Sequence, residues 1–401
     1  MSVDIAADQA EIDDEREPDI REAVGAAEVV LRRRFGAKIQ LAEPEDLGGS
    51  DDTTVIRVRV AASPFALPRT LVIKRHAEPP PDTPCESFVR EAVSYQLFTA
   101  LAAEDRMCAE LFAHDGPSRV VVLEDLGRAP TLAEKLIGPD GRVAERALLS
   151  WARSLGRLHA TTAGRDADFD ALLRRLAPVR LKGDPLAVQG PIALAKLPDL
   201  LQDALGVSTP TAVAERAERT RWLLETSRHR AFSPSDACPD NNLITNRGVR
   251  FLDFEGGCVR NIMLDAANLR MPFPSCWCAF GLPAGMTDAM FAAWRAEVQG
   301  MWPDLRDDAV VLPRLLDSQL FWVWVSTYWF LPRPGESDGP IDGHLPAPRR
   351  SASLAARWSQ LAEFAGRGGA GQVAEHARAV VDGLTARFGP DLTLPLYPAF
   401  R

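Results

Sequence analysis

Apolar and polar residues alternate along parts of the first 125 positions in the way expected of a β-sheet. In the segment 53–61, Ile56, Val58 and Val60 alternate with Arg57 and Arg59, and this period of two predicts a half-buried strand. Further strands are predicted near 38–42, 70–75, 108–114 and 118–124. Helical patterns cover 22–35 and 86–102, so this part of the chain is predicted to be a small β-rich lobe.

From residue 130 onward the pattern becomes mainly helical. The longest apolar run, Leu320–Leu331, has twelve residues, which is too short to span a bilayer. Its tryptophans Trp322, Trp324 and Trp329 therefore favour a buried helix over a stacking platform. The sequence predicts an α+β protein, with a small antiparallel sheet and one helix followed by a large, mainly helical region.

One short ribbon, at about 242–254, interrupts the helical pattern. In DACPDNNLITNRGVRFLDFEGG, residues 236–257, two apolar runs flank an Asn-Arg-Gly turn, which predicts a β-hairpin. Asp236 and Asn241 precede its first strand and Asp253 ends its second, so folding brings these three side chains together. Such a cluster is either a solvated loop or a site for a hard cation such as Mg²⁺.

Charge is concentrated at the N-terminus. Residues 1–24 contain nine acids and two arginines, a net charge of −7 out of the total of −9. This composition predicts a disordered acidic tail at 1–24. We expect two folded lobes after this tail, at 25–126 and 127–401.

The nearly neutral body gives no basic surface for nucleic acid, and no run is long enough for a membrane span. The N-terminus lacks the apolar core of a signal peptide. Six cysteines are scattered without a disulfide framework, and Cys276 and Cys278 are interpreted as buried reduced thiols rather than metal ligands. We therefore expect a cytoplasmic protein; its oligomeric state is left open.

Four segments of the predicted β-rich lobe contain candidates for binding a charged ligand. Gly49 and Ser50 lie in a Gly-Gly-Ser turn between strands, which can present N–H groups and a hydroxyl to phosphate. Lys74, one of only five lysines, either extends along the surface to solvent or points an ammonium into a cleft. Glu91 is either a solvated helix residue or close enough to reach a neighbouring strand. An apolar strand at 120–123 then leads into the acidic connector that contains Glu124 and Leu126.

The order of these features resembles the aminoglycoside phosphotransferase family, the small-molecule branch of the protein-kinase-like fold. Two further segments, Ser154-Leu-Gly-Arg-Leu-His-Ala160 and Leu252-Asp-Phe-Glu255, are similar to motifs of this branch, and Asp265 matches its conserved brace. The resemblance covers about residues 40–270. It implies a protein-kinase-like two-lobe fold, with a nucleotide-binding lobe at 25–126 and a catalytic, substrate-binding lobe at 127–401. It also implies a phosphotransferase that uses ATP or GTP, Mg²⁺ and a small-molecule hydroxyl acceptor.

The same resemblance implies a role for each candidate in phosphoryl transfer. Lys74, held by Glu91, would pair with the α- and β-phosphates, which Gly49 and Ser50 would cover. The remaining roles are the metal ligands Asn241 and Asp253, the catalytic base Asp236, and the purine-facing connector residues Glu124 and Leu126.

Two departures from the family pattern keep alternatives open. Pro234 and Ser235 replace the His-Gly that usually precedes Asp236, and Asp51 and Asp52 place carboxylates in the phosphate loop. A nucleotide-binding pseudokinase acting through a partner is therefore an alternative to the enzyme.

The acceptor is also undecided among an aminoglycoside or other antibiotic, a sugar and an amino-alcohol metabolite. Glu336, Asp338 and Asp342, in a Pro/Gly-rich segment, either receive a cationic acceptor or belong to an ordinary surface loop.

Overall fold

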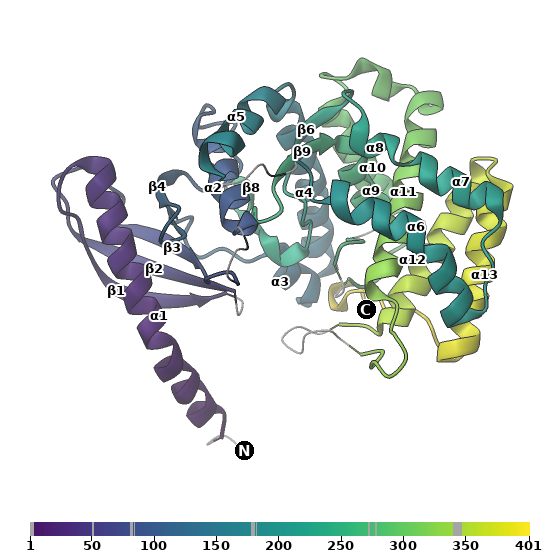
Figure 1. Cartoon of the computed structure of the whole chain (residues 1–401), viewed down its shortest axis with the longest axis horizontal. Helices are drawn as coiled ribbons and strands as arrows, with labels where there is room; N and C mark the ends of the chain where they lie inside the picture. The colour runs from purple at the N-terminus through teal and green to yellow at the C-terminus, as the bar shows by residue number, and fades with distance from the viewer. Residues whose placement is uncertain are drawn as a thin grey trace. The chain divides into compact units, whose positions relative to one another are not determined.

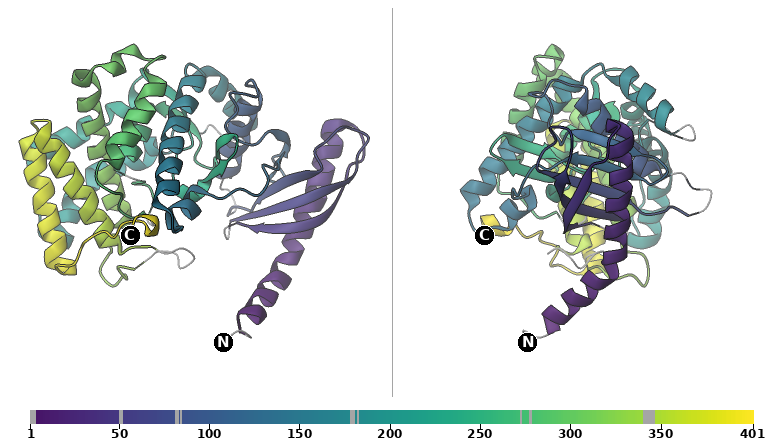
Figure 2. Two further views of the ribbon diagram at one scale, coloured as in Figure 1. Left: turned by 180° about the vertical axis from the view of Figure 1, so that it is seen from behind. Right: turned by 90° about the vertical axis from the view of Figure 1, so that its left-hand side faces the viewer.

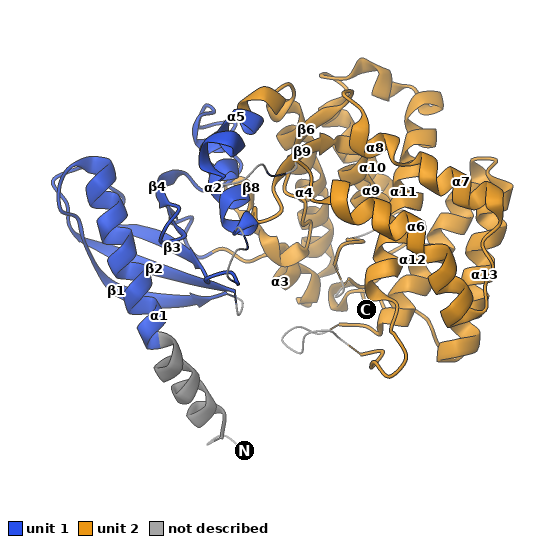
Figure 3. Ribbon diagram, in the orientation of Figure 1, with its two compact units in different colours: residues 1–128, 169–181 blue, residues 129–168, 182–401 orange. Residues whose placement is uncertain are grey.

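The computed structural model describes residues 4–49, 52–80, 83, 85–177, 181, 183–271, 273–276, 279–339 and 347–401, with side chains from Glu17 onward. The chain forms two compact units, which Figure 3 shows in different colours. The first unit comprises residues 1–128 and 169–181, and the second comprises residues 129–168 and 182–401.

The first unit is built on a five-stranded antiparallel sheet with the strand order β1-β2-β3-β5-β4. Its strands are β1 (Gln40–Gly48), β2 (Thr53–Ala62), β3 (Thr70–His76), β4 (Leu111–Asp115) and β5 (Val120–Glu124). In β2, Ile56 and Val58 are fully buried while Arg57 and Arg59 reach solvent. The predicted fold class, an antiparallel sheet followed by a mainly helical region, is confirmed.

Helix α1 (Asp4–Phe35) covers one face of this sheet (Figures 1 and 2). Ala23 and Leu31 of the helix are completely buried in the sheet core, and Ile20 packs against it. The folded body therefore begins earlier than the predicted end of the acidic tail at residue 24. The many acidic residues of this segment obscured a sparse stripe of apolar residues at helical spacing. One of the acids, Glu22, also pairs with Arg75 of β3 at 2.6 Å.

The first unit contains helical residues beyond the two helical patterns that were predicted at 22–35 and 86–102. Besides α1, it includes α2 (Glu86–Thr99) and the part of α5 (Asp166–Leu176) from Phe169 onward. The functional division at residue 126 stays a prediction.

The second unit consists mainly of helices, with two small two-stranded sheets. Its helices are α3 (Leu132–Ile137), α4 (Gly141–Thr162), α6 (Leu186–Leu205), α7 (Thr211–Arg219), α8 (Trp222–Glu225), α9 (Ile262–Arg270), α10 (Met286–Val298), α11 (Asp308–Phe330), α12 (Arg350–Arg367) and α13 (Gly371–Phe388). Its strands are β6 (Arg230–Ser233), β7 (Asn242–Thr245), β8 (Gly248–Phe251) and β9 (Cys258–Asn261). Short 3-10 turns occur at Pro239–Asn241, Pro303–Arg306 and Pro398–Phe400.

Helix α11 forms the centre of the second unit, where it packs against α6, α9 and α12. It is apolar around most of its circumference, as expected of a helix that is covered on all sides. Trp322 and Trp324 are 1% and 0% exposed, and the Trp322 indole donates a hydrogen bond to the Leu264 carbonyl at 2.7 Å. These two tryptophans belong to the core, as predicted. No helix in the described part of the chain combines the length and apolar character that a membrane crossing requires.

Helices α12 and α13 lie side by side (Figure 1) and enclose a histidine. His376 is 3% exposed, and its ring meets that of Trp358 edge-on at 5.7 Å. Among the described residues, neither ring nitrogen has a hydrogen-bond partner. Burial lowers the pKa of His376 to about 4, so the imidazole is neutral at pH 7.

We expect this histidine to make the protein less stable in mild acid. The unfolded chain binds the proton near pH 6.5, whereas folded His376 does so only near pH 4. As pH falls between these values, the free energy of unfolding should drop by about 3 kcal/mol. His376→Leu should remove this component, which melting curves of both proteins from pH 7 to pH 4 would measure. The same pH dependence in both proteins would contradict the assignment.

Candidate active site

A buried ion pair joins the third strand to helix α2 in the first unit. Lys74 lies on β3 between Val55 of β2 and Val121 of β5. Its ammonium nitrogen lies 3.1 Å from Oε1 and 3.0 Å from Oε2 of Glu91. Lys74 is 7% exposed and Glu91 is 0% exposed. Lys74 therefore does not extend to solvent, and Glu91 is not a solvated helix residue.

His76 is a second partner of Glu91 that the sequence analysis missed. Its Nε2 lies 2.7 Å from Oε2 of Glu91, and the residue is 2% exposed. Burial alone would raise the pKa of Glu91, but Lys74 and His76 outweigh this effect and hold the pKa below its usual value. The available signal was spacing, because residues i and i+2 of a strand project from the same face.

The turn between β1 and β2 requires glycine at one position. Gly49 has a φ of +138°, and a Cβ atom there would lie 2.2 Å from the Thr53 carbonyl oxygen. Gly48, at φ +94°, donates its N–H to the Asp46 carboxylate at 2.8 Å. Ser50 and Asp51 lie outside the described residues, so of Gly49 and Ser50, the two residues predicted to cover phosphates, the structure places only Gly49.

The connector after β5 is anchored by a residue that the sequence analysis did not select. Asp125 accepts two hydrogen bonds from the Arg57 guanidinium, at 2.9 and 3.2 Å, and one from the Gly127 N–H. Glu124 accepts a hydrogen bond from the Glu110 N–H at 3.2 Å, so its side chain is engaged within the sheet. Leu126 is half-buried. The Glu124 N–H also donates to the Glu110 carbonyl at 2.8 Å, so a contact of Glu124 or Leu126 with a nucleotide base stays a prediction.

In the second unit, the predicted hairpin forms from β7 and β8. Asn242 pairs with Phe251 and Thr245 with Gly248, and Gly248 has a φ of +95°. The Leu252 N–H donates to the Asn241 carbonyl at 2.9 Å. Asp253 therefore follows directly on a residue that is bonded to Asn241, and the two ends of the hairpin meet as expected.

Asp236 and Asn241 are in direct contact within the loop before this hairpin. The Asn241 amide donates to Oδ2 of Asp236 at 3.0 Å, and the Cys238 N–H donates to Oδ1 at 3.1 Å. Partial burial, reinforced by the carboxylates Asp240 and Glu255, raises the pKa of Asp236 to about 6. Asp236 is still exposed on one side, so water screens part of this effect. A carboxylate with a pKa this close to neutrality is suited to accept a proton.

Two residues of this region have backbone angles that side chains rarely adopt. Asp253 has a φ of +58° and Ser235 a φ of +67°. Such conformations cost of order 1–3 kcal/mol and persist where the surrounding structure holds them. Ser235 precedes Asp236 and Asp253 follows β8 by two residues, so both strained positions lie in the loops at the open end of the hairpin. This location is consistent with a functional constraint there.

A buried network of hydrogen bonds and ion pairs around Asp265 supports the loop that carries Asp236. Asp265 accepts from the Arg260 guanidinium and from the Ser233 hydroxyl at 2.9 Å, and its Oδ2 lies 3.0 Å from Nε2 of His159. Burial would raise the pKa of Asp265, but Arg260 and His159 lower it to about 2. The Ser233 oxygen also accepts the Ser235 N–H at 3.0 Å. This chain therefore supports its Pro234-Ser235-Asp236 loop from Ser233, without the histidine of the family pattern.

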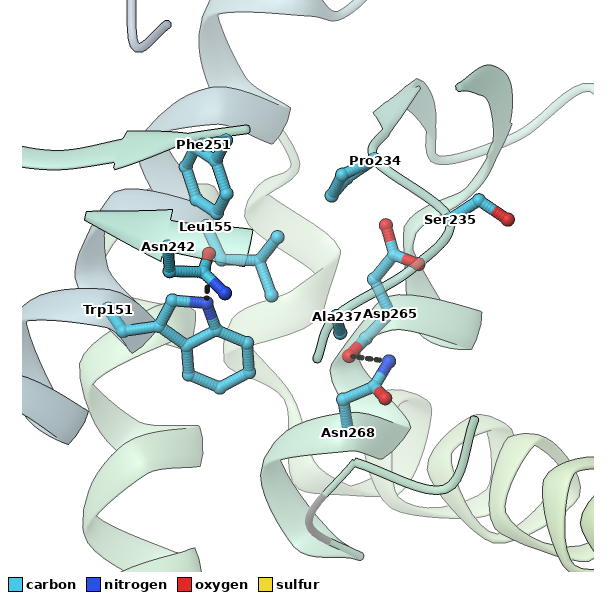
Figure 4. Close-up of a pocket in the computed structure, with 9 residues that line it drawn as sticks. All are labelled: Trp151, Leu155, Pro234, Ser235, Ala237, Asn242, Phe251, Asp265 and Asn268. Atoms are coloured by element: carbon cyan, nitrogen blue, oxygen red, sulfur yellow. Dashed lines mark hydrogen bonds between the residues drawn. The ribbon is translucent and has the colours of Figure 1, made fainter. Parts of the chain in front are cut away.

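Asn242, the neighbour of Asn241, has a structural role. It is 1% exposed, accepts a hydrogen bond from the Trp151 indole at 3.1 Å and donates to the Cys238 carbonyl at 2.7 Å. Figure 4 shows Asn242 against Trp151 in a cavity of about 10 Å³ behind the loop. That volume holds about one water molecule, so the cavity is no site for a nucleotide or an acceptor. Asn241 is thus better placed than Asn242 for an external ligand.

The acidic residues of the Pro/Gly-rich segment are largely used within the fold. Asp338 accepts from the Ser351 hydroxyl and N–H, at 2.5 and 2.8 Å, and pairs with Arg349 at 2.8 Å. Glu336 pairs with Arg350 at 3.4 Å. These bonds fix the start of α12, while Asp342 lies outside the described residues. The loop interpretation is therefore favoured over a receptor for cations.

The predicted thiol pair at Cys276 and Cys278 is wrong for Cys276. The sulfur of Cys276 is bonded to that of Cys238, 38 residues earlier in the sequence. Cys278 lies outside the described residues. The pairing joins segments that are distant in sequence, so local spacing could not have indicated it.

Comparison with known proteins gives matches among solved structures alone; no protein-family model and no curated protein matches the chain. A choline/ethanolamine kinase family protein from Mesorhizobium loti is 16% identical, with a TM-score of 0.44 over 85% of this chain and 93% of that chain. A putative fructosamine-3-kinase from Haemophilus somnus 129PT is 12% identical, with a TM-score of 0.46 over 86% and 99%.

An aminoglycoside phosphotransferase in ternary complex with AMP-PNP and hygromycin B is 11% identical, with a TM-score of 0.43 over 88% and 98%. All three structures are of small-molecule kinases by name, the class that the sequence motifs resemble. At these identities and TM-scores they indicate no substrate for this chain.

The Asp265 network generates a stability prediction. Asp265→Asn would leave the fully buried Arg260 without its closest counter-charge, and breaking such a pair typically costs 3–5 kcal/mol. We expect a loss of about that size in the free energy of unfolding, measured by urea titration at pH 7. The matched control is Asp288→Asn, which removes a 65% exposed partner of Arg270 and should cost less than about 1 kcal/mol. Equal losses in both variants would contradict the role given to the network.

Proposed function

We propose that this protein is a small-molecule O-phosphotransferase that moves the γ-phosphate of ATP or GTP to a substrate hydroxyl in the presence of Mg²⁺. The observation that carries the proposal is the buried pair of Lys74 and Glu91 in the first unit. A buried ion pair rarely stabilises a fold more than apolar side chains of the same volume. Its presence on the strand next to a glycine-dependent turn is well explained by a ligand with phosphate groups.

Lys74 is suited to the nucleotide phosphates because an ammonium is a compact point charge. Glu91 holds this charge in place, and His76 contacts Oε2 of the same carboxylate. Gly49 and Ser50 would cover the phosphates, and the connector would present backbone groups of Glu124 and Leu126 to the base.

Asp236 would orient the acceptor hydroxyl and accept its proton. The N–H of Cys238 and the amide of Asn241 each bond one of its oxygens, which fixes the direction of the carboxylate. The raised pKa of about 6 brings the base nearer to the pH at which it works. Positioning and charge neutralisation are the main demands of phosphoryl transfer.

Asn241 and Asp253 are the residues that would hold Mg²⁺. An amide oxygen and a carboxylate are the hard oxygen donors that this ion prefers, and the two residues are joined through the bond from Leu252 to Asn241. The donor set therefore fits the ion. When bound, Mg²⁺ would supply neutralisation of phosphate charge.

The competing function is a pseudokinase that binds nucleotide without transferring phosphate. It would use the same residues of the first unit and needs no acceptor. The hydrogen-bonded carboxylate of Asp236, with its raised pKa, favours the enzyme, because nucleotide binding alone does not require a base. The acceptor class stays open among hydroxylated antibiotics, sugars and amino alcohols, and the cytoplasmic location stays a prediction.

Removal of one proposed metal ligand should abolish the effect of Mg²⁺ on nucleotide binding without abolishing nucleotide binding itself. In Asp253→Ala we expect no Mg²⁺-dependent turnover, and nucleotide affinity that no longer changes when Mg²⁺ is added. Calorimetric titration of ATP and GTP with and without Mg²⁺ measures the second effect without any acceptor. Asp240→Ala, a nearby exposed acid on the same loop, serves as the control. Wild-type Mg²⁺ dependence in Asp253→Ala would sink the metal assignment.

The experiment that tests the function compares binding with turnover in Asp236→Asn. Nucleotide affinity should be nearly unchanged, because Asp236 contacts the acceptor. Phosphate transfer, assayed against a panel of aminoglycosides, sugars and amino alcohols, should fall by about 10²–10⁴-fold. Nucleotide binding by the wild type without transfer to any acceptor would support the pseudokinase, and equal loss of both properties would show a structural role for Asp236.

A further inference from the structure

Cys238 is at the centre of the loop that carries the proposed catalytic base. Its N–H donates to Asp236 at 3.1 Å, and its carbonyl accepts from the Asn241 N–H at 3.1 Å and the Asn242 amide at 2.7 Å. The positions of the Asp236 carboxylate, the Asn241 backbone and the Asn242 amide therefore depend on the position of Cys238. A constraint on this one residue becomes a constraint on the base and on a proposed metal ligand.

The disulfide to Cys276 supplies such a constraint. Cys276 is 1% exposed, and its backbone is held on the far side by α12. Arg357, itself 4% exposed, donates to the carbonyls of Cys276 at 2.7 Å and Phe273 at 3.2 Å. The disulfide thus connects the loop that carries the exposed Asp236 to the buried segment around Cys276.

The two cysteines also differ in access. Cys238 is only half-buried, whereas Cys276 is buried. A small thiol or disulfide can approach the pair from the Cys238 side. In the reducing compartment that the sequence predicts, a disulfide is more often a redox switch than a permanent cross-link.

We infer that Cys238 and Cys276 form a reversible redox modification site that orders the catalytic loop when oxidised. The oxidant is a small-molecule disulfide of the glutathione type. The Cys238 thiolate attacks it, forming a mixed disulfide and releasing one thiol. The Cys276 thiolate then attacks the Cys238 sulfur and releases the second thiol. Two electrons pass to the small disulfide, and the two cysteine protons end on the two released thiols.

Mass spectrometry after equilibration with glutathione and its disulfide tests the pairing. Unreacted thiols are alkylated, and chymotryptic cleavage after Trp277 separates Cys276 from Cys278. We expect Cys238 and Cys276 to lose and regain alkylation together as the redox ratio changes. Independent behaviour of the two thiols, or pairing of Cys238 with Cys278, would overturn the inference.

Hydrogen exchange of the full-length wild type tests the effect on the loop and needs neither nucleotide nor acceptor. On reduction, amides in the segment 235–242 should exchange about tenfold faster or more. In Cys276→Ser, exchange should be fast and independent of redox state. The matched control is Cys85→Ser, a half-buried free cysteine of the first unit, which should behave as the wild type. Equal loop exchange in the oxidised and reduced wild type would refute the switch.

The effect on turnover rests on the proposed function. With an accepted substrate, reduction should slow transfer by on the order of tenfold, because a loosened base is less often in the reactive geometry. Nucleotide affinity should change little. A redox effect on exchange without turnover in either state would leave the switch in place and count against the phosphotransferase. Faster transfer after reduction would overturn the ordering role.

Discussion

The second unit depends on the network of hydrogen bonds and ion pairs around the buried carboxylate of Asp265. Asp265 lies at the start of α9 and binds Arg260 of β9, Ser233 of β6 and His159 of α4. Each partner comes from a different element, so one charge fixes two strands and two helices relative to one another. The loop that carries Asp236 leaves β6 immediately after Ser233. Its geometry is therefore set by a residue that would not touch a substrate.

Three acids of this protein have different protonation behaviour because their surroundings differ. Glu91 and Asp265 are almost completely buried, and neighbouring cations hold the pKa of each below its usual value. For Asp236, desolvation together with the neighbouring carboxylates Asp240 and Glu255 raises the pKa to about 6. Permanently charged acids are suited to holding structure, whereas a base must be able to exchange a proton. The distribution of charge thus separates supporting acids from the proposed catalytic one.

Sequence patterns failed where a sparse or distant signal was hidden by a stronger local one. Acidic composition obscured the apolar stripe of α1, so that the folded body was predicted to begin after residue 24, although Ile20 and Ala23 pack on the sheet. His76 belongs to no recognisable sequence motif, although it shares a strand face with Lys74. Residue type alone does not distinguish Asn241 from Asn242. The spacing from Asp236 in the family motif selects Asn241, and the burial of Asn242 against Trp151 agrees with that choice.

The sequence by itself determined the fold class, the strands of the first unit and the hairpin, and it proposed the candidate residues, because each is encoded in local periodicity or a short motif. It did not predict the pairing of β6 with β9. The tertiary structure decided which partners these residues have. The anchoring of Asp125 by Arg57 and the bond between Cys238 and Cys276 join positions that are far apart in the chain. Such contacts follow from how whole elements pack, and packing depends on the summed burial of many side chains rather than on any one segment.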